Sequence, residues 1–192
     1  MGNNANIFTF TQAAGADGTG LAWFAATGST APTDATTALA AAWKNAGMIT
    51  DNGVVQKFSE SSKTIKAAGS TAIQRTLVTD DSFTFDIEFL ENGPVAKAVF
   101  ARKPIGSISP GVGTGAFSVT YGLYTRQLYA GAFDMLDGSN HVRLYCPTVE
   151  TTTRKDITYN NANPATFGVT VTAYPDSTGV AVYEYNVMAA LG

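Results

Sequence analysis

The chain has one histidine and one cysteine, His141 and Cys146, five residues apart. A cysteine beside a histidine can act as a nucleophile, because the imidazole accepts the thiol proton. In an extended strand, however, side chains five residues apart point to opposite faces. Cys146 shares the apolar face with Val142 and Leu144, so the pattern predicts a buried thiol. A zinc site would need further ligands, and the sequence has no spacing typical of one.

Paired carboxylates are the second candidate for chemistry. Asp80 and Asp81 are adjacent, and Asp86 and Glu88 stand two residues apart. Two carboxyl groups in a cleft can transfer protons, but adjacent acids before a strand are more typical of a solvated turn. Asp86 and Glu88 simply occupy the polar face of the strand that follows. We therefore expect no catalytic residue, no cofactor and no metal, and we do not expect an enzyme.

A glycine-rich segment, residues 111–115, resembles a phosphate-binding loop. Such a loop needs a strand before it and a helix after it. Residues 117–123 alternate as a strand does, and no lysine directly follows the glycines. The sequence therefore predicts a flexible loop over residues 105–115. Trp23, Trp43 and Tyr183 could stack on bases, but no arginine or lysine is interleaved with them, which favours core packing.

The clearest structural pattern lies in residues 81–91. Large apolar residues alternate there with polar ones, which predicts a half-buried β-strand. A row of four large apolar side chains needs an opposing apolar layer, so this strand should lie at the centre of a core. The row consists of Phe83, Phe85, Ile87 and Phe89. The candidates for core or subunit-interface contacts are Trp43, Phe83, Phe85 and Phe89.

The remaining elements are mostly short strands. One helix is predicted over residues 34–46, with Asp34 or Thr33 as its cap and Gly47 as its end. A second helix is predicted to begin at Pro94. Further strands are predicted at 21–26, 54–60, 63–68, 71–78, 117–123, 142–146 (closed by Pro147), 166–173 and 181–187. Residues 128–136 are less regular, and residues 148–153 form a strand or loop. About ten strands and two helices predict an all-β dominated sandwich or barrel with one or two short flanking helices and long loops or arms.

Length and composition limit the possible functions. A chain of 192 residues predicts a single domain over residues 1–192, of which residues 1–20 read as an N-terminal arm. The formal net charge of −3 argues against a strong grip on nucleic acid. We expect no signal peptide and no membrane span, because no long apolar run is present.

An ordered set of motifs covers residues 32–91. Pro-Thr-Asp begins the predicted helix at residue 32, and Trp-x-x-x-Gly ends it at Gly47. Asp-Asn-Gly-Val follows at residue 51, Ile-Lys-Ala-Ala-Gly at residue 65, and the Phe-rich strand ends in Leu-Glu at residue 91. Together these motifs resemble the major tail tube proteins of long-tailed (siphovirus-type) bacteriophages, particularly those of actinobacteria. Residues 169–176 resemble the closing strand of that family, whereas Ala68 stands where many relatives have tryptophan.

The resemblance implies a two-sheet β-sandwich with a flanking helix. Six copies would form a ring, inner sheets would join into one barrel, and rings would stack into a hollow tube for DNA ejection. Loops and terminal arms would bridge neighbouring rings. The implied partners are further copies of the chain and the tape measure, tail terminator and tail tip proteins. The implied location is the tail of the virion, after assembly in the host cytoplasm.

The lumen of such a tube must let DNA pass without binding it. Each lysine or arginine that contacted a phosphate would add attraction, so a neutral or acidic lumen is expected. Asp86 and Glu88 are the candidates for lumen-facing acidic residues.

Two other functions are compatible with the pattern. The same fold serves the inner tube of contractile injection systems, where a sheath would be the partner. A β-sandwich carbohydrate-binding or adhesion module is the other, in which Tyr121, Tyr124, Tyr129 and Tyr145 would form a sugar-binding platform.

Overall fold

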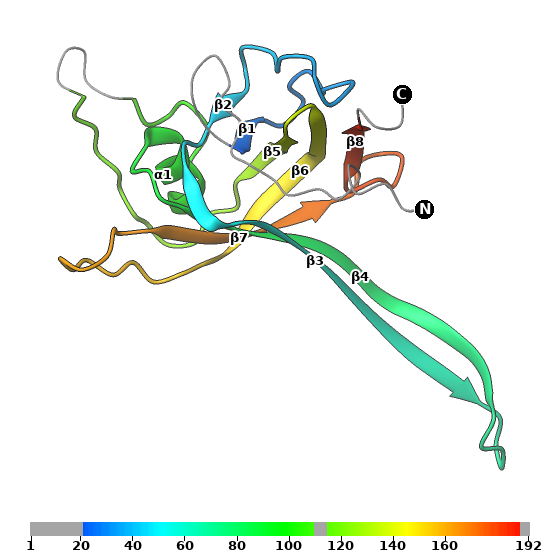
Figure 1. The fold of residues 1–192 in the computed structure, drawn as a ribbon. Coiled ribbons are helices and arrows are strands. Elements are labelled where there is room, and N and C mark those ends of the chain that lie inside the picture. Colours follow the sequence, from blue (N-terminus) through cyan, green and yellow to red (C-terminus); the bar gives the residue numbers. More distant parts are fainter. Residues whose placement is uncertain (1–20, 110–114, 189–192) are drawn as a thin grey trace.

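The computed structural model describes residues 21–109 and 115–188. The predicted N-terminal arm, residues 1–20, and residues 110–114 of the predicted loop lie outside the described residues. Within the described ranges, one antiparallel sheet of eight strands carries one helix (Figure 1). This architecture confirms the all-β dominated fold with a short flanking helix.

The strands follow the order β2-β1-β5-β6-β7-β4-β3 across the sheet, and β8 pairs with β6. The elements are β1 (Ala22–Ala26), β2 (Lys44–Asn45), β3 (Ile49–Lys66), β4 (Ile73–Phe89), α1 (Pro94–Ala101), β5 (Leu128–Asp137), β6 (Asn140–Arg154), β7 (Phe167–Tyr174) and β8 (Tyr183–Val187). The described residues thus contain eight strands and one helix, fewer than the ten strands and two helices predicted.

The sheet curls over one apolar core. Neighbouring strands lie about 4.8 Å apart, so the four steps from β1 to β4 would span roughly 19 Å in a flat sheet. Phe24 of β1 nevertheless meets Phe89 of β4 with ring centroids 6.4 Å apart. Phe85 and Phe133 lie closer still, at 4.8 Å. Strands that are not neighbours therefore face each other across the core. The described residues form one continuous curled sheet, and not the two separate sheets that the resemblance implies.

Helix α1 covers part of this core. Pro94 begins it, where the missing N–H of proline costs no hydrogen bond. Arg102 ends it with φ 55°, and its N–H group bonds the carbonyl of Val99. Val99 and Phe100 are buried against the sheet. The prediction of a helix that begins at Pro94 is confirmed.

Residues 34–46 do not form the predicted helix. The carboxylate of Asp34 accepts hydrogen bonds from the N–H groups of Thr36 and Thr37, as a helix cap would. Nη1 of Arg143, from β6, donates to the carbonyls of Asp34 and Thr37 at 3.0 and 2.7 Å. A continuing helix needs those carbonyls for its own N–H groups. The chain instead runs across the sheet and enters β2.

This segment covers the other face of β1, β5 and β6. The indole N–H of Trp43 donates to the carbonyl of Thr30 at 3.0 Å. The Trp43 ring packs edge-on against Tyr145, with centroids 6.0 Å apart, in a second cluster with Ala25, Ala130 and Ala132. The two faces of this end of the sheet are therefore both covered.

Several predicted strand boundaries are wrong. The segments 54–60, 63–68, 71–78 and 81–91 belong to two long strands, β3 and β4, with register shifts that absorb the polar breaks. Asp80 and Asp81 accordingly lie inside β4 and not in a turn. Residues 117–123 alternate in sequence but form no strand. Pro147 does not end β6, because it lies at a register shift in the β5–β6 pairing, where its lack of an N–H is tolerated.

The longest feature is an arm that leaves the body. Strand β4 pairs with β7 only from Phe83 to Phe89, whereas β3 and β4 pair with each other out to Lys66 and Ile73. Residues 58–82, the hairpin arm, therefore form a two-stranded ribbon that extends away from α1 (Figure 1). Its exposed large apolar residues are Phe58, Ile65, Ile73 and Val78.

Candidate functional site

Asp86 and Glu88 lie on the face of β4 opposite the core residues Phe85 and Phe89. One Asp86 carboxylate oxygen accepts a hydrogen bond from Lys57 Nζ at 2.5 Å, and the other accepts from the Thr170 hydroxyl at 2.7 Å. Partial burial raises the pKa of Asp86, but the hydrogen bonds from Lys57 and Thr170 outweigh it and hold the pKa below its ordinary value. The carboxylate is therefore ionised at neutral pH.

Glu88 has an equivalent set of partners. Its carboxylate accepts from Lys155 Nζ at 3.4 Å and from the Thr166 hydroxyl at 2.5 Å. Gly168 makes room for this pairing, because a Cβ atom there would lie 2.5 Å from Cδ of Lys155. Two carboxylates and two lysines thus share this part of the sheet, here called the polar face, and their charges balance. A face of this kind offers phosphate groups no net attraction.

His141 and Cys146 are not brought together. Cys146 is fully buried in the core, and burial raises the pKa of its thiol to about 12. Nε2 of His141 lies 3.9 Å from Oδ1 of Asp134, outside that core. Burial is the main reason why the pKa of His141 lies below its ordinary value. His141 is therefore not placed to accept the proton of this thiol, and the raised pKa keeps Cys146 protonated at neutral pH.

The four tyrosines do not form a sugar-binding platform. Tyr121 and Tyr124 are exposed, but Tyr129 and Tyr145 are buried. The Tyr129 hydroxyl donates to the carbonyls of Ala98 and Lys103, which ties β5 to the end of α1. This result removes the basis for a carbohydrate-binding module.

The described residues were also compared with the requirements of a metal site and of a membrane span. Within residues 21–109 and 115–188, no three His, Cys, Asp or Glu side chains gather where they could hold a metal ion. The helix in these ranges is also too short to cross a membrane.

A buried ion pair holds residues 34–37 on the sheet, and the sequence analysis missed it. Arg143 binds Asp134 through two hydrogen bonds, Nε to Oδ1 at 2.5 Å and Nη2 to Oδ2 at 2.9 Å. The same guanidinium also binds the carbonyls of Asp34 and Thr37. Asp134 and Arg143 face each other in the β5–β6 register, a cross-strand pairing that depends on the strand alignment.

We expect Asp134→Ala to lower the free energy of unfolding by about 3–5 kcal/mol. The substitution leaves Arg143, a residue that is 3% exposed, without its carboxylate partner, and an uncompensated buried charge is costly. Urea unfolding of the monomer, followed by tryptophan fluorescence, measures the change. Glu184→Ala, at an exposed site on β8, is the matched control and should change stability by less than about 0.5 kcal/mol. A loss below about 1 kcal/mol for Asp134→Ala would contradict this account.

An antiparallel sheet with an exposed apolar ribbon is typical of a subunit that binds other protein chains. A family model described as phage tail tube protein matches residues 11–187 of the chain. The chain therefore belongs to the phage tail tube family, and it is a structural component of the virion. No curated protein matches the chain at a significant level.

Proposed function

We propose that this chain is the major tail tube subunit of a long-tailed phage. Six copies form a ring, and the rings stack into the hollow tube through which DNA is ejected. The hairpin arm is the observation that carries the proposal. Among residues 21–109 and 115–188 no third strand pairs with its ribbon, and Phe58 and Val78 are 65% and 67% exposed. An isolated two-stranded hairpin is marginally stable in water, so a neighbouring copy that covers the arm would supply the missing contacts.

The arm suits a contact between copies of one chain that does not close on itself. It extends away from the body of its own chain (Figure 1), which leaves it free to contact a surface of another copy that is not that copy's arm. Head-to-tail contacts that do not close generate open filaments, as stacked rings require. Burial of each large apolar side chain of the arm contributes about 1.5–3 kcal/mol, and pairing of open strand edges removes an aggregation hazard. The arm therefore supports the bridging of neighbouring rings.

The polar face supports a lumen position for β4 and β7. When the inner sheets of a ring join, the face away from the core borders the channel. Asp86 and Glu88 are each paired with a lysine, and each accepts a hydrogen bond from one threonine hydroxyl. DNA in the channel then meets hydroxyl groups and balanced charges, without fixed cations that hold phosphates. The tape measure, tail terminator and tail tip proteins are the proposed partners inside the tube and at its two ends.

Negative-stain electron microscopy of the concentrated protein tests the proposal. We expect hollow tubes or six-membered rings, with a repeat of roughly 40 Å along the tube, since strands of about ten residues and their turns span such a distance. The same protein at low concentration is the control and should be monomeric. Protein that stays monomeric at every concentration, even with the tail tip and tape measure proteins, would contradict the proposal.

A further inference from the structure

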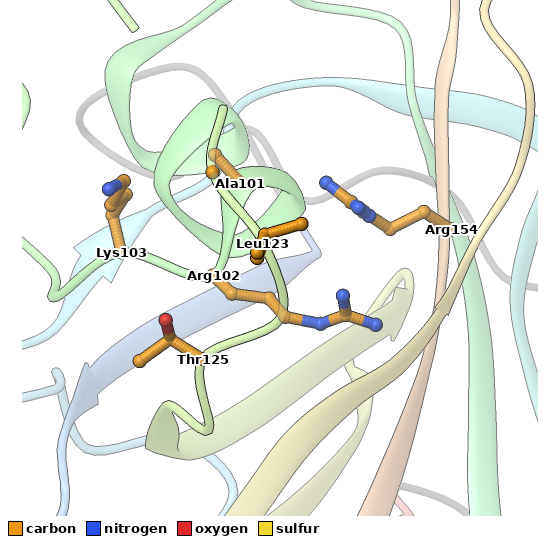
Figure 2. Close-up of a pocket in the computed structure, with 7 residues that line it drawn as sticks. Ala101, Arg102, Lys103, Leu123, Thr125 and Arg154 are labelled. Carbon is orange, nitrogen blue, oxygen red and sulfur yellow. The ribbon is translucent and has the colours of Figure 1, made fainter. Parts of the chain in front are cut away.

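A cationic pocket lies at the C-terminal end of α1. It measures about 170 Å³, and its lining includes Arg102, Lys103, Leu123 and Arg154. In Figure 2 the guanidinium groups of Arg102 and Arg154 lie on one side of Leu123, and the Lys103 side chain lies on the other. Among the ion pairs of the described residues, none involves these three cations. The pocket therefore carries an unbalanced positive charge.

Neutral groups hold the two guanidinium groups in place. Arg102 donates from Nε and Nη2 to the carbonyls of Thr151 and Thr152 at 2.8 and 2.9 Å. Arg154 lies over the Phe100 ring, 5.7 Å from its centroid. Both side chains are held in place without a carboxylate partner. Binding of an anion would therefore cost little free energy for ordering them. Leu123, which is 97% exposed, adds an apolar contact beside the charges.

The hairpin arm carries the complementary groups. Glu60 of β3 lies directly opposite Asp81 of β4, and like charges in that position destabilise a sheet. Neither carboxylate forms an ion pair within the described residues. Phe58 lies two residues from Glu60, so the two side chains share one face of the ribbon. The arm thus presents an exposed phenyl ring next to two carboxylates.

We propose that the cationic pocket of one copy binds the Phe58–Glu60–Asp81 face of the arm of the next copy. The inference rests on the proposed function, because it assigns the contact by which the subunits join. The carboxylates pair with the three cations of the pocket, Arg102, Lys103 and Arg154, and Phe58 packs on Leu123. The arm extends away from α1 (Figure 1), so the contact forms between two chains and leaves each chain with one free arm or pocket. Repetition of this contact builds an assembly of many copies.

Disulfide trapping tests the contact at the level of two chains. In a Cys146→Ser background, one protein carries Phe58→Cys and a second carries Leu123→Cys. Mild oxidation of the mixture should give a mixed covalent dimer, because a disulfide forms only when the Cα atoms come within about 7 Å. Val187→Cys on β8, also an exposed apolar site, replaces Leu123→Cys in the control mixture and should give at least tenfold less. Equal yields from the two mixtures would overturn the proposal.

Charge reversal with rescue tests the electrostatic part. Glu60→Lys with Asp81→Lys, or Lys103→Glu with Arg154→Glu, should each reduce the yield of tubes at least tenfold. Combining all four changes in one chain should restore most of that yield. Arg102 stays unchanged because it also caps α1. Tubes from both double variants at the wild-type yield would overturn this contact and leave the proposed function intact.

The remaining outcomes separate the two proposals. If the wild-type protein never forms tubes but the Phe58→Cys and Leu123→Cys pair is trapped selectively, the proposed function fails and the contact stands. If inorganic phosphate shifts the Arg154 side-chain NMR signal of the monomer at sub-millimolar concentration and no selective disulfide forms, the pocket binds a free anion and the proposed contact is wrong.

Discussion

Replacing residues 60–81 with a two-residue Asn-Gly turn is expected to give a folded monomer that no longer forms tubes. Ser59 and Ser82 are cross-strand partners, so a short hairpin turn can join them without a change of register. Pairing of β4 with β7 begins at Phe83 and is preserved, as are the core residues Phe85 and Phe89. The deletion removes Glu60 and Asp81, the two carboxylates that we propose to contact the next copy, together with the outer part of the arm, and it leaves Phe58 in place.

Three measurements check this expectation. Circular dichroism and thermal unfolding should report a cooperative fold, sedimentation velocity should show a monomer, and electron microscopy should show no tubes. Ser59→Ala with Ser82→Ala, which alters the base of the arm but keeps its length, is the control and should assemble normally. Tubes of the shortened protein at the wild-type yield would remove the arm from the assembly contact.

Asp86→Lys with Glu88→Lys is expected to allow tube assembly but to slow DNA ejection at low salt. The polar face would change from two lysines balanced by two carboxylates to four lysines in each copy. Each phosphate contact adds a slope of about 0.9 in the logarithmic dependence of DNA affinity on salt concentration. Lys57 and Lys155 have side chains that are 56% and 54% exposed, so they stay hydrated when they lose their partners.

Ejection kinetics of phage that carry the variant subunit give the readout. The rate should fall most at 50 mM salt and recover towards the wild-type rate as salt increases. Asp86→Asn with Glu88→Gln should give a smaller effect, because it removes the carboxylates without adding cations. Glu184→Lys on β8 adds a cation away from the polar face and is the matched control. Ejection at the wild-type rate at every salt concentration would show that the polar face does not line the channel.

Local patterns in the sequence were enough to predict the central part of β4 and the start of α1. Alternation along Phe85, Ile87 and Phe89 is a short-range signal. These side chains of β4 lie in the hydrophobic core, as the pattern predicts. Pro94 marks the start of α1 for an equally local reason, since the proline ring is compatible with the first turn only. The order of motifs in residues 32–91 gave the family.

Long-range contacts explain the helix that does not form. Arg143 takes the carbonyls of Asp34 and Thr37 from more than a hundred residues away, so the helix signal of residues 34–46 is overridden. No local pattern contains that contact. Pro147 was predicted to end a strand, but β6 continues past it, because a register shift in the β5–β6 pairing accommodates the proline.

The polar face and the hairpin arm could not be predicted from local patterns either, because both depend on contacts between distant parts of the chain. Glu88 and Lys155 are 67 residues apart, and their pairing depends on the β4–β7 register and on the absence of a side chain at Gly168. The sequence predicted the acidic residues but not the lysines that balance them. The arm was missed because Ser61, Ser62 and Ser70 read as breaks between short strands, whereas the paired backbone runs through the first two.

Strand β4 gives the subunit a continuous path for mechanical load. It runs without interruption from the far end of the hairpin arm to Phe89 in the core, and seven residue pairs join it to β7. A pull on the arm acts along the strand, across hydrogen bonds that lie perpendicular to it. These bonds are then loaded in shear and must break together, whereas a peeling force would break them one at a time. In the proposed tube, tension passed through the arm would load the seven β4–β7 pairs in shear, so we expect the arm's contact with its neighbour to yield before the subunit unfolds.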